Sequence, residues 1–155
     1  MEHDINVMRI CVYTYFEHLR HLKENVHEIE ARIREIRSSI ELKAIVYSSM
    51  PGGPSTDGDK FGNALARLEN ANAEWDAAID NLYIEYDKMM RLCLPSYLGR
   101  YALWLHKVEH HSWEYVGRIT GYSESHIKRI GYEAIPEMYE LIPESFRRSS
   151  IPNAI

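Results

Sequence analysis

Two histidines and a glutamate are spaced so that they could bind a zinc ion. His106, Glu109 and His110 match the pattern H-x-x-E-H, in which two histidines on one helix face bind zinc and the glutamate acts as a base. A catalytic zinc site needs a third protein ligand, and no neighbouring residue is marked out for that role. We therefore expect these histidines to be solvated or to face phosphate, and we expect no metal and no cofactor.

Serine-containing motifs in the same part of the chain do not complete an enzyme site. The run from Gly121 to Ser125 lacks the last glycine of a nucleophile elbow, and no strand is expected before it. Ser125 and Lys128 fit the short pattern S-x-x-K, but the match has no further support. Gly52-Gly53 is not followed by the Lys-Ser/Thr of a phosphate-binding loop. The sequence therefore predicts a protein that is not an enzyme.

Residues 112–135 have the pattern of a helix-turn-helix. Ser112 can cap a helix and Ser123 a second one, because a serine hydroxyl accepts a bond from a free amide of the first turn. Gly117 is small where two helices must approach closely, and Gly121 suits the positive φ at a helix end. The expected inner face of the first helix is Trp113, Val116 and Ile119. The expected core face of the second helix is Ile127, Ile130 and Ala134.

The remaining face of the second helix carries side chains that bind nucleic acids. In a helix-turn-helix the start of this helix meets base edges in the major groove, while nearby Lys, Arg, Ser and Tyr side chains hold phosphates. An alternative partner for Arg129 is Glu133, four positions further on, in a salt bridge within the helix. We expect base contacts from Ser125, His126 and Arg129. We expect phosphate contacts from Ser123, Lys128 and Tyr132.

The charge of the chain argues neither for nor against DNA as a partner. A net charge of −5 argues against a protein that coats nucleic acid without sequence preference, because such proteins are usually strongly basic. The acidity belongs to the N-terminal part. From Tyr97 onward, seven lysines and arginines are matched by seven glutamates, and four histidines could add positive charge near DNA.

Two long apolar seams predict the helices that carry this segment. From Val12 to Ile40 apolar residues recur at alternating spacings of three and four, which is typical of a coiled coil and predicts a helix over about 6–46. Prolines and glycines at 48–58 end that helix. A second seam runs from Phe61 to Cys93, and Pro95 ends it. Two such helices joined by a short breaker favour an antiparallel hairpin.

The sequence therefore predicts an all-α fold, in which a long antiparallel, coiled-coil-like helical hairpin precedes a C-terminal helix-turn-helix domain. We place the hairpin, an oligomerisation element, at residues 1–94. The helix-turn-helix domain is expected at 95–142, with a leading helix over about 96–109. Residues 143–155 are expected to form a tail.

Small residues beside the second seam predict self-association. Each hairpin helix has a narrow apolar stripe that one partner helix can cover. Ala64, Ala71 and Ala78 flank the second seam and leave room for another chain, so we expect a homodimer or a higher homo-oligomer. Asn72 lies on the seam, where it either fixes the register or the oligomer state of the helices or lies near a solvated edge.

The expected compartment is the cytoplasm. The chain has no run of about 18 apolar residues that could form a transmembrane helix. Its first four residues include the acidic Glu2 and Asp4 and lack the basic and apolar regions of a secretory signal. Cys11 and Cys93 fall on apolar helix faces, which is typical of buried free thiols in a reducing compartment. We expect no membrane partner.

Three stretches of the chain resemble the RinA/ArpU-type regulators of phage late genes. They are LRHLKENVHEIEARIREIRSSIE, MPGGPSTDGDKFGNALARLE and HSWEYVGRITGYSESHIKRIGYEAI. The resemblance extends from about Val12 to Leu141. Its most specific parts are the Met-Pro-Gly-Gly loop followed by Asp, and the order Ser-Trp, Gly-Tyr-Ser, Arg-Ile, Ala. The C-terminal half is also similar to region four of bacterial sigma factors.

The resemblance implies a transcriptional activator of phage late genes, including packaging genes, in the cytoplasm of a bacterial host. It implies double-stranded promoter DNA as a partner and raises bacterial RNA polymerase as a second one. The chain departs from the family pattern in the His-rich stretch HKVEHH and at Gly117, where alanine is commoner.

Two other functions stay open. Small terminase subunits, which act in DNA packaging, also combine a helix-turn-helix with a long helical hairpin, although their usual order places the DNA-binding unit first. The acidic balance of the chain favours instead a protein-binding inhibitor module built on a helix-turn-helix scaffold.

Overall fold

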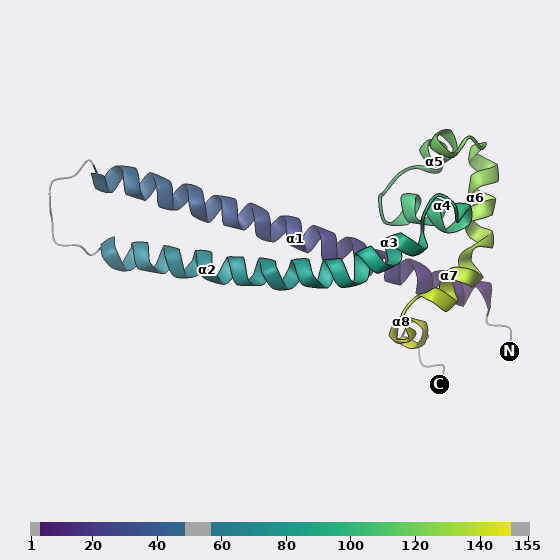
Figure 1. Cartoon of the computed structure of the whole chain (residues 1–155), viewed down its shortest axis with the longest axis horizontal. Helices are drawn as coiled ribbons and strands as arrows, with labels where there is room; N and C mark the ends of the chain where they lie inside the picture. Colours follow the sequence, from purple (N-terminus) through teal and green to yellow (C-terminus); the bar gives the residue numbers. More distant parts are fainter. Residues whose placement is uncertain (1–3, 49–56, 150–155) are drawn as a thin grey trace. The chain divides into compact units, whose positions relative to one another are not determined.

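The computed structural model describes residues 4–48 and 57–149, which form helices and turns and contain no strand. The predicted all-α class is therefore confirmed. The predicted breaker falls almost entirely on residues 49–56, and the end of the predicted tail on 150–155, both outside the described residues. The elements, shown in Figure 1, are α1 (Ile5–Ser48), α2 (Asp57–Leu82), the π-helical segment η1 (Tyr83–Asp87), α3 (Lys88–Leu92), α4 (Leu98–Lys107), α5 (Trp113–Thr120), α6 (Glu124–Glu133), α7 (Ile135–Leu141) and α8 (Glu144–Ser149).

The chain divides into two compact units. One unit is Leu22–Leu82, which combines most of α1 with the whole of α2. The other unit joins Met1–His21 to Tyr83–Ile155 and so combines the first turns of α1 with the elements from η1 to α8. The 44-residue helix α1 therefore contributes to both units. None of the helices in the described ranges is long and apolar enough to cross a membrane.

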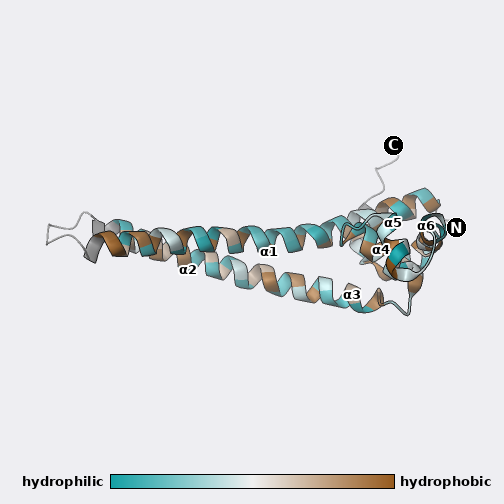
Figure 2. Cartoon of the chain, turned by 90° about the horizontal axis from the view of Figure 1, so that it is seen from above, coloured by the Kyte–Doolittle hydropathy of each residue, from teal (hydrophilic) through white to brown (hydrophobic). Residues whose placement is uncertain are grey.

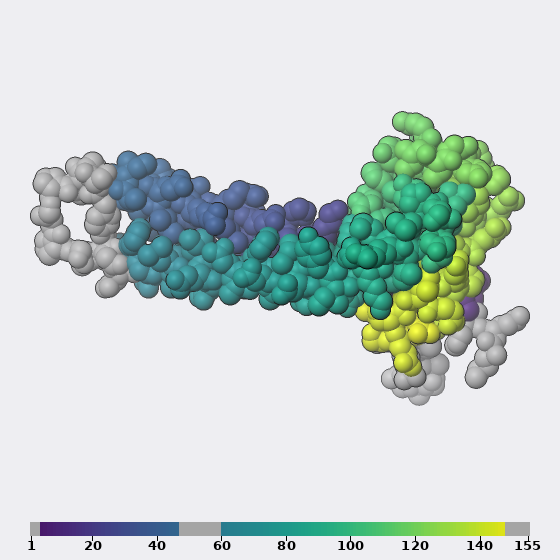
Figure 3. Space-filling model, viewed as in Figure 1, coloured from purple at the N-terminus to yellow at the C-terminus, as the bar shows by residue number. Residues whose placement is uncertain are grey.

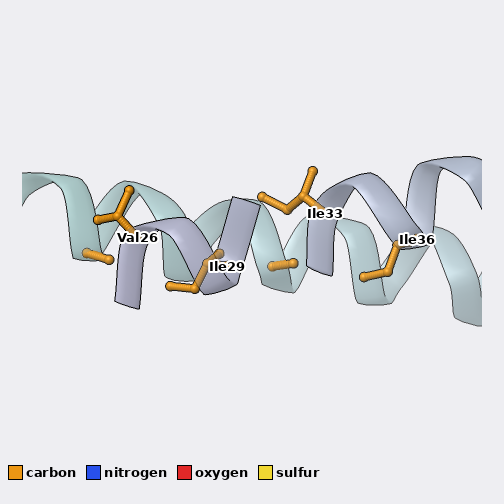
Figure 4. Close-up of a cluster of buried hydrophobic side chains, with 6 residues drawn as sticks. Val26, Ile29, Ile33 and Ile36 are labelled. Carbon is orange, nitrogen blue, oxygen red and sulfur yellow. The ribbon is translucent and has the colours of Figure 1, made fainter. Parts of the chain in front are cut away.

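In the Leu22–Leu82 unit, apolar and polar residues alternate along both helices (Figure 2). Within this unit the buried residues of α1 are Val26, Ile29, Ile33 and Ile36, which follow one another along the helix (Figure 4). They pack against Ala71 and Ala78 of α2, which are 3% and 8% exposed. Trp75 Nε1 donates a hydrogen bond to Glu30 at 3.2 Å, and Arg32 pairs with Glu74 at 3.0 Å.

The prediction that Ala64, Ala71 and Ala78 leave room for another chain is wrong. Of the residues of α2 whose burial the structure describes, these three alanines are the most deeply buried. A methyl side chain lets the backbone of α2 approach the branched side chains of α1. The larger seam residues Leu68 and Trp75 pack against the same cluster but are only partly buried.

The second long helix is interrupted where the seam predicts continuity. At η1 the backbone turn widens to a π-helix, and Tyr83 and Ile84 are 68% and 69% exposed. The next two side chains are engaged within the second unit: Tyr15 donates a hydrogen bond to Glu85 at 3.2 Å, and Tyr86 donates one to Glu109. The seam then continues through α3 to the buried Met89 and Cys93.

The start of α1 forms part of the core of the second unit. Its buried residues are Cys11, Val12, Tyr15, Phe16 and Leu19. Phe16 contacts Trp104 of α4 edge to face, with ring centres 6.3 Å apart, and Phe146 of α8 meets Tyr15 at 4.9 Å. The described part of the predicted tail is therefore a helix that packs on α1. Figure 3 shows the space-filling surface of α4 to α8 in green and yellow.

Candidate nucleic-acid interface

The helices α5 and α6 are joined by a tight turn, residues 121–123, that has the predicted caps. The Ser112 hydroxyl accepts a hydrogen bond from the Tyr115 amide at 3.2 Å, and the Ser123 hydroxyl accepts one from the His126 amide at 3.3 Å. Gly121 has a φ of 80°, the left-handed conformation that ends many helices. These side chains satisfy backbone groups at the start of each helix and fix where the helix begins.

The close approach expected at Gly117 is also present. A Cβ atom at this position would lie 2.7 Å from the Tyr122 carbonyl oxygen and 3.3 Å from the Glu124 amide nitrogen. The turn therefore packs directly on α5 through backbone atoms, which have little freedom to move.

The buried residues of α5 and α6 agree with the inner faces predicted from the sequence, except at Ile119. Trp113, Val116 and Ile127 are buried, but Ile119 is 45% exposed, so its assignment to the inner face is wrong. The buried side of this eight-residue helix runs through Trp113, Val116 and Gly117. At about 100° per residue, Ile119 points about 120° away from that line. Of the second helix, Ala134 is buried and Ile130 is half-buried.

The six predicted contact residues are all exposed, but the structure brings only four of them together. A groove of about 520 Å³ runs along α6 and is open to solvent. Its lining residues are Ser125, Lys128, Arg129 and Tyr132 of the predicted set, with Ile5, Glu133 and Pro136. Ser123 is not among them, because its hydroxyl caps α6. His126 lies instead against the Tyr122 ring, with ring centres 5.2 Å apart.

Arg129 adopts the alternative pairing considered for it. Its Nε atom lies 3.8 Å from a Glu133 carboxylate oxygen, and the two side chains are 67% and 70% exposed. An exposed pair of this kind contributes about 0.3–0.5 kcal/mol. The guanidinium could therefore exchange Glu133 for another hydrogen-bond acceptor at low cost.

Tyr132 is held more firmly than a free surface residue. Its ring meets Trp113 edge to face at 5.9 Å, and its exposed fraction is 37%. Tyr13, on the first turns of α1, lies beside it. Burial, and after it the neighbouring Tyr132 hydroxyl, raises the pKa of Tyr13 to about 12. Tyr132 thus joins α6 to both α5 and α1.

The residues of the zinc-like pattern point to three different places. His106 stacks on Trp113 with ring centres 4.2 Å apart, and its Nδ1 donates a hydrogen bond to the His111 carbonyl at 2.8 Å. Glu109 is bound by Tyr86, and His110 Nε2 bonds to Arg20 at 2.6 Å. No group of three metal-ligating side chains is found among the described residues. His106 is half-buried, so its ring is only partly solvated.

Sequence reasoning missed Ile5, Pro136 and Lys107 as neighbours of this face. Ile5 and Pro136 line the groove, and the Lys107 ammonium lies over the Tyr13 ring, 4.1 Å from its centre. Only the basic, His-rich stretch around Lys107 carried a signal.

The chain matches no protein-family model, no curated protein and no solved structure.

Proposed function

We propose that the chain is a sequence-specific DNA-binding regulator of transcription, in which α5, the turn and α6 form a helix-turn-helix. The observation that carries this proposal is the exposed stripe on α6. Ser125, Arg129 and Lys128 lie within one side of the helix, on the open groove, while Ile127 on the opposite side is fully buried. The stripe offers hydroxyl, guanidinium and ammonium donors to a partner.

The dimensions of α6 suit the major groove of DNA. Ten residues give a helix about 15 Å long, and the groove, about 12 Å wide, admits one helix. The base contacts in this proposal come from Ser125, His126 and Arg129. Ser123, Lys128 and Tyr132 contact phosphates, as expected for residues near the start and along the side of such a helix. Of these six, Ser123 and Tyr132 have structural roles as well.

We further propose that α1 and α2 form an antiparallel helical hairpin that makes the protein a homodimer or a higher homo-oligomer. The face of α2 that carries Ala64, Ala71 and Ala78, the alanine face, does not support self-association, because α1 covers it. Leu42 and Leu65, which are 65% and 40% exposed, are the supporting observation. A symmetric pair of chains would present two copies of α6 to paired half-sites.

The biological role proposed is activation of phage late genes in the cytoplasm of a bacterial host, with RNA polymerase as a further partner. It rests on the resemblance of three sequence stretches to RinA/ArpU-type regulators. In vitro transcription tests this role, with a template that carries the DNA site to which the protein binds. More transcript from bacterial RNA polymerase is expected when the protein is added, and less transcript would indicate a repressor.

The experiment that tests DNA binding is selection of bound fragments from a random and a genomic duplex pool, at two salt concentrations. One enriched motif is the expected result. Salt-sensitive binding without a motif would favour the DNA-packaging alternative. Absence of binding at low salt, where phosphate contacts are strongest, would contradict the proposal and favour the protein-binding inhibitor module.

A further inference from the structure

The arginines and lysines of the C-terminal helices differ in how they are paired. Each described arginine side chain of α4 to α8 lies 3.3–3.8 Å from a glutamate carboxylate, in the pairs Arg100–Glu137, Arg118–Glu114, Arg129–Glu133 and Arg147–Glu140. The lysines of these helices are Lys107 and Lys128. Neither has a carboxylate within ion-pairing distance among the described residues. Among the described side chains, their charges are therefore not paired with a carboxylate.

Both ammonium groups lie near tyrosine rings instead. Lys107 Nζ is 4.1 Å from the centre of the Tyr13 ring, and Lys128 Nζ is 5.9 Å from that of Tyr132. Tyr13 and Tyr132 are themselves neighbours. Lys107, Tyr13, Tyr132 and Lys128 therefore form a continuous row, which we call the lysine–tyrosine row, across α4, α1 and α6.

The row joins the groove beside α6 to a second positive charge. Lys128 and Tyr132 line that groove together with Ser125. Lys107 extends the same row beyond Tyr13, on a different helix. A cation held over an aromatic face keeps its outward N–H groups available, and a lysine without a carboxylate partner can bind phosphate without first breaking an ion pair.

We propose that Lys107 binds a DNA phosphate beside the groove that α6 enters, and that Tyr13 is the residue that positions its ammonium group. This inference rests on the proposed DNA-binding function. It adds to that function a backbone contact from outside the helix-turn-helix, supplied by α4 and supported by the first turns of α1. DNA is favoured over an acidic protein because the row is continuous with the hydroxyl and cationic side chains of α6.

The test measures how the affinity of the full chain for its selected duplex depends on salt. Each phosphate contact contributes about 0.9 to the slope of log K against log salt concentration. Lys107→Gln should lower the affinity several-fold at low salt and reduce the slope by about 0.9. Lys107→Arg should keep the slope. Lys88→Gln is the matched control, because Lys88 is an exposed lysine of the same unit, on α3, and it should leave the slope unchanged.

The positioning role of Tyr13 is tested by a double-mutant cycle. Tyr13→Phe keeps the ring beneath Lys107 but removes the hydroxyl that meets Tyr132, so it should bind more tightly than Tyr13→Ala. Tyr13→Ala should weaken binding, and the loss should disappear when Lys107 is already glutamine, because both changes act on one contact. A purely structural effect would persist in the Lys107→Gln background. Thermal unfolding of each variant shows whether the fold is retained.

The failures of the two proposals are distinguishable. If Lys128→Gln reduces the slope while Lys107→Gln and Lys88→Gln both behave like the wild type, the role of Lys107 is overturned and DNA binding stands. If the wild-type chain binds no duplex even at low salt, both proposals are overturned. Equal losses from Tyr13→Ala in the two backgrounds would overturn the positioning role alone.

Discussion

The carbonyl oxygen of Tyr122 lies 2.7 Å from the place where a Cβ atom of Gly117 would be. Gly117→Ala should therefore push the turn away from α5 and lower the free energy of unfolding by about 1–3 kcal/mol, as overpacking typically does. Gly62→Ala is the control, because a Cβ at this position of α2 meets nothing within 4 Å. It should stabilise the helix by about 0.5–1 kcal/mol. Urea unfolding measures both, and equal stability of Gly117→Ala and the wild type would contradict the close approach.

Ser123 and Ser125 are two positions apart but should respond differently to alanine. Ser123→Ala removes the hydroxyl that caps α6 and should lower the unfolding free energy by about 1 kcal/mol. Ser125→Ala should leave stability nearly unchanged, because this exposed serine lies on the open groove, and should weaken DNA binding instead. Denaturant unfolding and a binding titration separate the two effects, and an unchanged stability of Ser123→Ala would argue against the cap.

Arg129→Ala should weaken binding to the selected DNA site by about 1–3 kcal/mol, the usual cost of a lost bidentate base contact. Arg118→Ala is a suitable control, because Arg118 also pairs with a glutamate four positions away but lies on α5. Retention of full affinity and sequence preference by Arg129→Ala would remove Arg129 from the set of base-reading residues and leave Glu133 as its partner.

The buried alanines of α2 predict the effect of larger side chains. Ala71→Leu should clash with the branched residues of α1 and cost about 1–3 kcal/mol of stability. Ala73 is the control, because it lies two positions away and is exposed, so Ala73→Leu should be nearly neutral. Both are read by thermal unfolding. If Ala71→Leu were tolerated as well as Ala73→Leu, the alanine face could not be the contact with α1.

His106 should make the stability of the chain depend on pH. Burial lowers its pKa in the folded state, the bond to His111 partly opposes this, and the nearby Lys107 and Lys128 lower the pKa further. The unfolded chain then binds more protons, so stability should fall as the pH drops below the ordinary histidine value of about 6.5. His106→Asn can keep a donor to His111, and it should show a smaller loss between pH 7 and pH 5. An identical pH profile would contradict the prediction.

The features predicted correctly from the sequence are those that short segments decide. A helix was expected over about 6–46 and is observed at Ile5–Ser48, because an unbroken seam without glycine or proline leaves the backbone no other periodic structure. Ser112, Ser123 and Gly121 act within three or four residues of themselves. Their roles follow from local hydrogen bonding and steric freedom, and neither depends on the rest of the fold.

The incorrect predictions concern which side of a helix meets which partner. The larger residues of the second seam do pack on the core, but the alanines next to them, expected to leave room for another chain, are the more deeply buried. Ile119 is apolar and exposed because α5 is only eight residues long and has a narrow buried side. The π-helical segment at Tyr83–Asp87 interrupts a seam whose spacing shows no defect. In each case the predicted and the observed arrangements suit the local sequence equally well, and they differ only in which side chains pack together.

The sequence by itself thus determined the helices, their caps and the polar stripe of α6, since these depend on neighbours along the chain. Only the tertiary structure decided that the first turns of α1 join the C-terminal helices, and that Lys107 and Tyr13 lie together although they are far apart in the sequence. The physical reason is that side chains on separate helices meet only through burial of the shared core, where Phe16 contacts Trp104. The spacing of residues along a single helix does not indicate that contact.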